Sequence, residues 1–336
     1  MQTCATTGAD ARTSVRRCAT DAVQGVLTPA CNRSMHGFMR WIFILLMCAG
    51  CSPALLRTIG TQDPFIYDAA AVARADKVAV FIPGALSSIE VFGPSRNWEA
   101  AGFARAFYRY PGLDGLATDH RLDPSTAAAD VARFANGLQP GAQVVLVGYS
   151  TGALIALEAA PLIAPGHKVR VAAMSPAVEH AGGLRTIASG AGDVARAVQF
   201  TGSLSKEKVW PRFWAGLLFG REALAAPMPS RALREAVAEG AMIQTKLDTQ
   251  IALAHTLALP GWRLPNNLDL TGIPVAFFIG LSDPVFSTRQ TTDFSRKIGG
   301  VPILGYPGQG HLLFFTRPDV FGDMLDFAEG RPPRLR

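Results

Sequence analysis

Cysteine is scarce in this chain and is confined to one end of it. Only five cysteines occur in 336 residues, at Cys4, Cys18, Cys31, Cys48 and Cys51. The chain beyond residue 51 therefore holds no disulfide, and it shows no Cys/His cluster with the spacing of a zinc site. An exported protein that needs no structural disulfide fits this distribution.

Charge is sparse as well, and several nucleotide-binding patterns are missing. Charged residues make up 17% of the chain, and the formal net charge is +6. The sequence contains no run of Lys or Arg, and it contains no segment in which basic and aromatic residues alternate. This excludes the usual signature of nucleic-acid binding. The sequence also lacks an internal repeat and a phosphate-binding glycine loop. We therefore expect no nucleic-acid partner and no cofactor.

No apolar run is long enough to cross a membrane, which takes about 20 residues. The most apolar stretch begins after Arg40, reads WIFILLM, continues through CAG to Cys51 and meets Pro53. A positive residue, a short apolar segment and small residues in this order are typical of a signal peptide, with a buried core helix as the alternative. We predict a signal peptide over residues 35–50, translated from Met35 or Met39, and an extension over residues 1–34 without a folded role.

The end of this stretch, Ala49-Gly50-Cys51, resembles the lipobox of bacterial lipoproteins. The resemblance implies that Cys51 is lipidated and becomes the first residue, which anchors the protein to a membrane. Ser52 after the cysteine implies the outer membrane where one exists. Cys48 stands where the motif usually has Leu, so ordinary signal-peptidase cleavage, and a secreted or periplasmic protein, is the alternative. From Cys51 onward the formal charge is +3, which indicates no particular partner.

After a predicted linker, residues 51–74, short apolar runs alternate with helix-like segments, which predicts a parallel α/β sheet. The expected strands are residues 77–82, 107–110, 144–149, 168–174, 273–279 and 301–304. A terminal helix is expected over residues 317–329. Residues 179–268 contain helix-like segments and an apolar cluster around Trp210 and Trp214, so we predict a helical cap insertion over the carboxyl edge of the sheet. The core then comprises residues 75–178 and 269–334.

The segment VVLVGYSTGALIALEAA, residues 144–160, changes character at one serine. A β-branched run comes before Ser150 and strong helix formers come after it, which predicts a strand that turns sharply into a helix. Gly148 and Gly152 around the serine match G-x-S-x-G, the nucleophile elbow, in which small residues let strand and helix approach closely. Ser150 is therefore the candidate nucleophile.

A serine hydroxyl needs a base, and the base needs a carboxylate that fixes its tautomer. His311 lies on a glycine-rich loop after the last predicted strand, whereas His180 and His255 fall in the insertion and are weaker candidates. Asp283 follows another strand, with Glu179 as the second choice. The chain order Ser150, Asp283, His311 is that of α/β-hydrolases.

Over about residues 75–330 the chain resembles the α/β-hydrolase superfamily. The triad order and a closing segment that runs from Gly310-His311 through Pro318 to Phe327 carry the resemblance. It implies a mostly parallel sheet flanked by helices, with the backbone N–H groups of Ala85 and Thr151 as oxyanion donors. Pro83 stands where that superfamily often has His, a departure that leaves a backbone donor possible.

These observations predict an exported, lipid-anchored serine hydrolase that cleaves carboxylic esters of apolar or acyl, lipid-like substrates. Thioester or amide cleavage and acyl transfer use the same machinery. Dehalogenases and epoxide hydrolases of the superfamily carry Asp at the elbow, where this chain has Ser150. A non-catalytic envelope binding protein that retains the fold is the alternative of another class. The sequence gives no indication of oligomeric state.

Overall fold

The computed structural model describes residues 57–178, 182–243, 251, 255, 259 and 262–332. The chain separates into a unit of residues 1–52 and a unit of residues 53–336, and all described elements belong to the second. The predicted extension 1–34, the signal segment 35–50 and Cys51 lie outside the described residues. No helix within the described ranges is long and apolar enough to cross a membrane.

The described residues form one seven-stranded sheet in the order β1-β3-β2-β4-β5-β6-β7. All neighbours pair in parallel except β1, which runs antiparallel to β3 at one edge. The strands are β1 (Phe65–Tyr67), β2 (Lys77–Ile82), β3 (Ala104–Tyr108), β4 (Gln143–Tyr149), β5 (Lys168–Met174), β6 (Val275–Gly280) and β7 (Ile303–Tyr306). This confirms the predicted α/β-hydrolase fold class.

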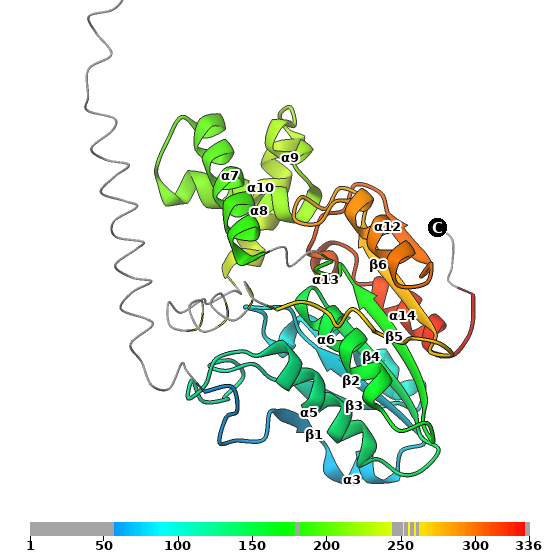
Figure 1. The fold of residues 1–336 in the computed structure, drawn as a ribbon. Coiled ribbons are helices and arrows are strands. Elements are labelled where there is room, and N and C mark those ends of the chain that lie inside the picture. Colours follow the sequence, from blue (N-terminus) through cyan, green and yellow to red (C-terminus); the bar gives the residue numbers. More distant parts are fainter. Residues whose placement is uncertain are drawn as a thin grey trace, which may run out of the picture. The chain divides into compact units, whose positions relative to one another are not determined.

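Helices cover both faces of the sheet (Figure 1). One face packs on α5 (Pro124–Asn136), α6 (Thr151–Ala159), η2 (Ala160–Leu162) and α12 (Thr288–Lys297). The other packs on η1 (Ile89–Arg96), α4 (Asn97–Ala100), α13 (Leu313–Thr316) and α14 (Val320–Ala328). In β4, Val144 and Leu146 join the first cluster while Val145 and Val147 join the second, which explains why the strand has no polar alternation.

The described part of the insertion is helical over most of residues 182–243, whereas residues 262–268 form no helix. Its elements are α7 (Gly182–Thr201), α8 (Lys206–Phe219), α9 (Glu222–Ala225) and α10 (Ser230–Ile243). They pack mainly on one another, around Ala215, Leu218, Ala223 and Ala238, and α8 also contacts α13 of the core. Trp210 remains 36% exposed, so the predicted aromatic cluster is only partly buried.

The segment predicted as a linker contains two elements that were not predicted from the sequence, β1 and α3 (Ala69–Arg74). Phe65 is buried, stacks on Phe134 at 4.4 Å and meets Tyr108 edge-on at 5.3 Å. A three-residue strand is too short to show an alternating pattern, and only its first residue is buried. The segment therefore extends the sheet rather than only connecting it to the N-terminal part.

Candidate active site

Ser150 occupies the turn between β4 and α6, the strand-to-helix context that the motif requires. Its backbone lies at φ 52° and ψ −115°, a region that costs a non-glycine residue about 1–3 kcal/mol. A Cβ at position 148 would lie 2.4 Å from Cα of Ala153, and one at position 152 would lie 2.1 Å from the Ile82 carbonyl oxygen. The two glycines are therefore required by close backbone contacts on either side of the serine.

His311 joins the serine to the carboxylate. Its Nε2 lies 3.1 Å from Oγ of Ser150, and its Nδ1 lies 2.7 Å from Oδ2 of Asp283. A carboxylate can only accept, so Nδ1 donates to Asp283 and Nε2 is left to accept from the serine hydroxyl. The structure thus brings the three residues together from the ends of β4, β6 and β7.

Asp283 is fixed in its orientation by the backbone that follows it. Its Oδ1 accepts hydrogen bonds from the N–H groups of Val285 at 2.7 Å and Phe286 at 3.0 Å. This leaves Oδ2 for His311. The side chain is only 2% exposed, so little water competes for the contact with the imidazole. The Ser-Asp-Pro turn of the sequence and the candidate acid are therefore the same feature.

The histidine loop rests on the helical insertion. The N–H groups of Gly310 and His311 donate to the carbonyl oxygens of Leu218 and Leu217, each at 2.7 Å. These acceptors belong to the last turn of α8, where carbonyl groups lack intrahelical partners. A Cβ at position 310 would lie 2.2 Å from the Leu217 oxygen, so this close approach requires the glycine. The insertion therefore helps to hold the histidine in place.

Aromatic rings enclose the imidazole. The ring of Tyr149 lies 5.4 Å from that of His311, and the ring of Phe286 lies 5.7 Å from it. Burial, and to a lesser degree the charge of Asp283, raises the pKa of Tyr149 well above its usual value. The phenol therefore stays protonated and contributes an apolar wall rather than a second base.

Ala85 and Thr151, the oxyanion donors that the resemblance implies, lie in the loop after β2 and directly after the serine. Thr151 is the first residue of α6, whose amino end carries partial positive charge. Gly84 lies so close to the elbow that a Cβ there would be 3.1 Å from Cβ of Ser150. Within the described part of the chain, neither the Ala85 N–H nor the Thr151 N–H has an acceptor. The role of these two N–H groups as oxyanion donors therefore stays a prediction.

Of the other sequence candidates, only His255 lies among the described residues. Glu179 and His180 lie outside the described residues. His255 is buried and engages other groups with both ring nitrogens, at 2.9 Å from the Leu86 nitrogen and 3.0 Å from the Pro111 oxygen. It therefore cannot serve as the base for Ser150. In the ranges that the structure covers, no group of three or more His, Cys, Asp or Glu side chains could hold a metal ion.

Sequence reasoning missed the supports of the site, namely Tyr110, the role of His255 and the α8 carbonyl groups. The Tyr110 hydroxyl donates to the Pro83 carbonyl oxygen at 2.6 Å, just before the Gly84-Ala85 segment. Tyr110 does end a predicted strand, immediately before Pro111-Gly112, and an aromatic residue at a strand's carboxyl end was the one available signal.

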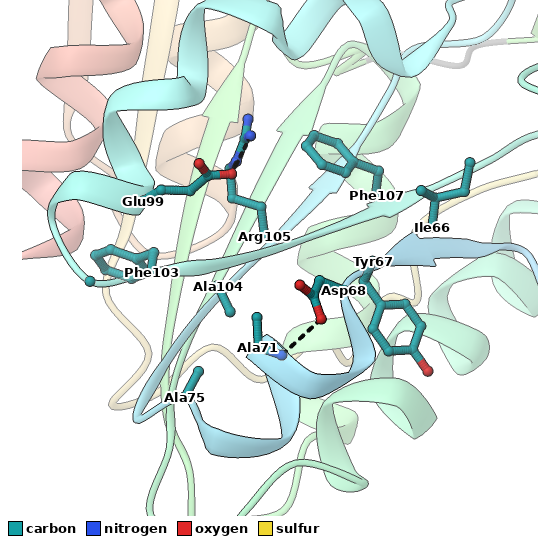
Figure 2. A pocket seen from close by; sticks show the side chains of 11 residues that line it. Ile66, Tyr67, Asp68, Ala71, Ala75, Glu99, Phe103, Ala104, Arg105 and Phe107 are labelled. Carbon is teal, nitrogen blue, oxygen red and sulfur yellow. Dashed lines mark hydrogen bonds and ion pairs between the residues drawn. The ribbon is translucent and has the colours of Figure 1, made fainter.

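A pocket of about 560 Å³ lies at the β1 edge of the sheet (Figure 2), and the serine is not among the residues that line it. It is lined by residues of β1, α3 and β3, among them the ion pair of Arg105 and Glu99. Asp68 in it accepts from the Ala71 N–H at 3.0 Å and so caps α3. The charged side chains Asp68, Glu99 and Arg105 thus have partners in the local structure.

A family model described as "Alpha/beta hydrolase family" matches residues 79–324. The chain belongs to this family. The matched range includes the elbow, the acid loop and the histidine loop, so the family assignment and the contact chain concern the same residues. A comparison with the curated proteins finds no match.

Solved structures of the same fold include several hydrolases. A carboxylesterase of Nitrososphaera gargenis is 18% identical, with a TM-score of 0.55 over 81% of this chain and 97% of that one. A thermophilic esterase from Thermogutta terrifontis is 13% identical, with a TM-score of 0.56 over 81% and 96%. The enol-lactonase of Burkholderia xenovorans LB400 is 14% identical, with a TM-score of 0.54 over 80% and 95%. At these identities the likeness concerns the fold.

Proposed function

We propose that this alpha/beta hydrolase is a serine hydrolase that cleaves carboxylic esters through an acyl-enzyme. The observation that carries the proposal is the placement of His311 between Ser150 and Asp283, at 3.1 Å and 2.7 Å. A general base within hydrogen-bond reach of a hydroxyl, itself oriented by a carboxylate, is the arrangement that activates serine for attack on a carbonyl.

In the first step, Oγ of Ser150 bonds to the ester carbon while its proton passes to Nε2 of His311. Asp283 stabilises the imidazolium that forms. The carbonyl oxygen becomes an oxyanion, and in this proposal it accepts hydrogen bonds from the N–H groups of Ala85 and Thr151. His311 then returns its proton to the alcohol oxygen as the C–O bond breaks, which leaves the acyl group on Ser150.

In the second step, water takes the place of the alcohol. His311 accepts a proton from the water, the hydroxide oxygen bonds to the acyl carbon, and the serine leaves with the proton held by His311. The products are a carboxylic acid and the free enzyme. Amide cleavage, thioester cleavage and acyl transfer to a second alcohol could follow the same route. We favour ester hydrolysis because esterases are among the proteins of similar fold.

An apolar acyl substrate is the part of the proposal that concerns specificity. Phe286 and Tyr149 flank the base, and α8 with its partly exposed Trp210 belongs to the insertion that contacts the histidine loop. Apolar surroundings favour an acyl chain over a charged substrate, because burying an unpaired charge is costly.

The test is hydrolysis of p-nitrophenyl esters from acetate to palmitate by the purified protein, with Ser150→Ala beside it. Catalysis by the wild type that the variant loses supports the proposal, with the best acyl length defining specificity. The alternative of a non-catalytic binding protein would be favoured if both proteins failed on esters, thioesters and amides alike.

Export and lipid anchoring at Cys51 rest on the sequence and remain a separate proposal. Several acyl chains together hold a protein stably on a membrane, since each buried CH₂ contributes about 0.8 kcal/mol. We expect the N-terminal peptide of the purified protein to begin at Cys51 with acyl chains attached, and Cys51→Ser to prevent this without altering ester hydrolysis. Mass spectrometry of the N-terminus and membrane fractionation decide the matter: an unmodified N-terminus upstream of residue 51 would contradict the anchor.

A further inference from the structure

The loop after β2 carries the Ala85 donor in an unusual backbone conformation. Leu86, the next residue, lies at φ 63°, in the left-handed region that non-glycine residues rarely adopt. Such a conformation persists only where the surrounding structure holds it. The position of the Ala85 N–H therefore depends on what fastens the backbone on either side of it.

His255 fastens the loop at Leu86. Its Nδ1 lies 2.9 Å from the Leu86 backbone nitrogen, and its Nε2 lies 3.0 Å from the Pro111 carbonyl oxygen. A backbone N–H can only donate and a carbonyl can only accept, so His255 must be neutral with its proton on Nε2. Its side chain is 0% exposed, which leaves no room for water to replace either partner.

Tyr110 fastens the same loop at its other end. Its hydroxyl donates to the Pro83 carbonyl oxygen at 2.6 Å, and its ring meets that of His255 edge-on at 5.5 Å. Pro83, before Gly84-Ala85, and Leu86, after it, are thus each held by a hydrogen bond to a buried side chain. Further along, the N–H of Ile89 donates to Asp114 at 3.0 Å.

We propose that His255 is a positioning residue of the oxyanion site, through which the helical insertion fixes the Ala85 donor beside Ser150. This inference rests on the proposed serine hydrolase function and deepens it. His255 does not touch the reacting atoms; it acts through the Leu86 N–H. An imidazole suits the place because it accepts at one nitrogen and donates at the other, and its pKa, lowered to about 4 by burial, keeps it neutral.

Two substitutions separate this role from plain core packing. The amide of His255→Asn overlaps the Nδ1 position and can still accept from Leu86, while it loses Pro111. The amide of His255→Gln reaches the Nε2 position and can still donate to Pro111, while it loses Leu86. Each variant deletes one buried hydrogen bond, so a merely structural histidine predicts equal damage from both.

The proposal predicts unequal damage in kcat. We expect kcat of His255→Gln on p-nitrophenyl butyrate to fall by about tenfold or more with KM nearly unchanged, towards the 10²–10³-fold lost when one oxyanion donor is removed. His255→Asn should stay within about threefold of wild type, since the loop keeps its acceptor. Tyr110→Phe, which removes only the hydroxyl at Pro83, should also lower kcat rather than raise KM.

The matched controls are His167→Asn and His167→Gln, in the turn before β5 at the opposite end of the sheet. Both should leave kcat unaltered. Equal kcat values for wild type and His255→Gln, or equal losses in His255→Asn and His255→Gln, would overturn the inference. A wild type that hydrolyses no ester and leaves a fluorophosphonate unreacted would instead overturn the proposed function, and this inference with it.

A measurement on the unaltered protein covers the case in which a variant does not fold. The ¹⁵N chemical shifts of His255 report its tautomer at pH 7. The inference predicts a neutral ring protonated on Nε2, with the Leu86 amide protected from hydrogen exchange. A ring protonated on Nδ1, or a charged ring, could not accept from Leu86 and would contradict it.

Discussion

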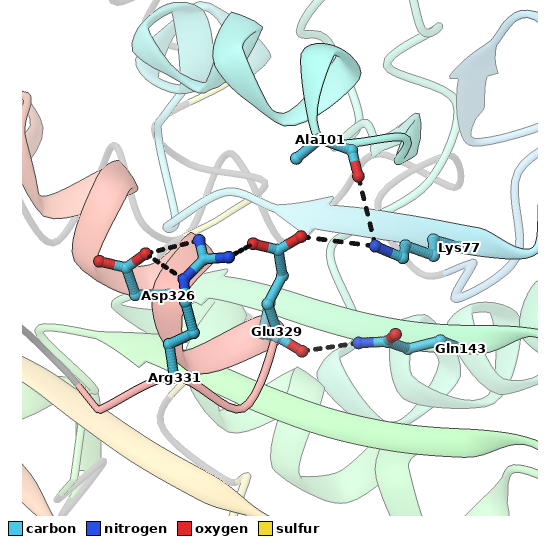
Figure 3. Close-up of polar contacts among 7 residues, drawn as sticks. Lys77, Ala101, Gln143, Asp326, Glu329 and Arg331 are labelled. Atoms are coloured by element: carbon cyan, nitrogen blue, oxygen red, sulfur yellow. Dashed lines mark hydrogen bonds and ion pairs between the residues drawn. The ribbon is translucent and has the colours of Figure 1, made fainter.

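Pairs of oppositely charged or titratable side chains lie at both ends of the parallel strands, but the pairs differ in how far they are exposed to water. At the amino end, Lys77 of β2 reaches Glu329 at 3.4 Å and Arg331 pairs with both Glu329 and Asp326 (Figure 3). The side chains of the cations Lys77 and Arg331 are 36% and 51% exposed, and those of their partners Glu329 and Asp326 are 18% and 6% exposed. At the carboxyl end the partners His311 and Asp283 are 9% and 2% exposed.

Both ends have paired charged groups. What distinguishes the candidate active site from a structural ion pair is that its partners are buried and that one of them lies within hydrogen-bond reach of a nucleophile. Ion pairs in contact with water contribute about 0–1 kcal/mol, and the amino-end pairs attach the C-terminal segment to the sheet. At the carboxyl end, directed backbone hydrogen bonds leave Asp283 one oxygen for His311, whose other nitrogen faces a half-buried serine hydroxyl. At this end, therefore, a base lies within hydrogen-bond reach of a hydroxyl that can act as a nucleophile.

Ser150→Ala should have the largest effect, because it removes the nucleophile on which the other groups of the carboxyl end act. We expect kcat for ester hydrolysis to fall by about 10⁶-fold while the protein keeps its fold, since one hydroxyl is lost. Thermal unfolding measured beside the kinetics checks that the fold is retained. Unchanged turnover in Ser150→Ala would remove the mechanism.

Aspartates at the two ends provide the sharpest matched pair. Asp283→Asn should lower kcat by about 10⁴-fold, because an amide at this place favours the wrong histidine tautomer. Asp326→Asn, which weakens the contact with Arg331 at the amino end, should leave kcat unaltered. Steady-state kinetics of both variants decide; similar kcat values for the two would contradict the assigned difference between the ends.

The buried His255 should make stability depend on pH. Its folded pKa of about 4 lies below the ordinary value of about 6.5, through burial and then the nearby His120; the Tyr110 ring also faces it and stays neutral. Between these pH values His255 is protonated in the unfolded chain but neutral in the folded protein. The free energy of unfolding therefore decreases as the pH drops from 6.5 to 4.

The expected loss over this range is about 3 kcal/mol from this residue alone. Urea unfolding of wild type and His255→Asn at pH 7 and pH 4.5 measures it. The variant should lose less stability on acidification than the wild type, and parallel pH dependences would show that His255 is not the group that titrates.

The smallest effect is expected at Lys77. Lys77→Met keeps the aliphatic stem but removes the charge that meets Glu329, so the free energy of unfolding should change by less than about 1 kcal/mol. Ester hydrolysis should not change. A loss of activity in this variant would mean that the amino end of the sheet contributes to catalysis after all.

Most of the core could be predicted from the sequence because its strands are buried on both faces. Residues 77–82 and 168–174 have the expected bounds as β2 and β5, and the elbow follows β4. The predicted boundaries were less accurate where pairing with another strand sets them. β3 begins at Ala104 rather than at Phe107, because its residues from Ala104 onward pair with β2. The edge strand β1 was missed because pairing with β3, not its own pattern, makes it a strand.

The residues at the site divide in the same way. Ser150, Asp283 and His311 each follow a recognisable strand, so chain order and turn residues suggested that they meet. The supports could not be found, because they depend on contacts between distant segments: Leu217 with His311, and His255 with Leu86. A buried histidine in a helical insertion resembles any core residue until its two hydrogen-bond partners are known.

The most direct test of the central claim is the site of covalent labelling by diisopropyl fluorophosphate. An activated serine displaces fluoride from phosphorus, and its proton passes to the base. Peptide mass spectrometry should place a single adduct on Ser150 in the wild type, formed far more slowly in Asp283→Asn and not at all in Ser150→Ala. An adduct on another serine, or none in the folded wild type, would contradict the account.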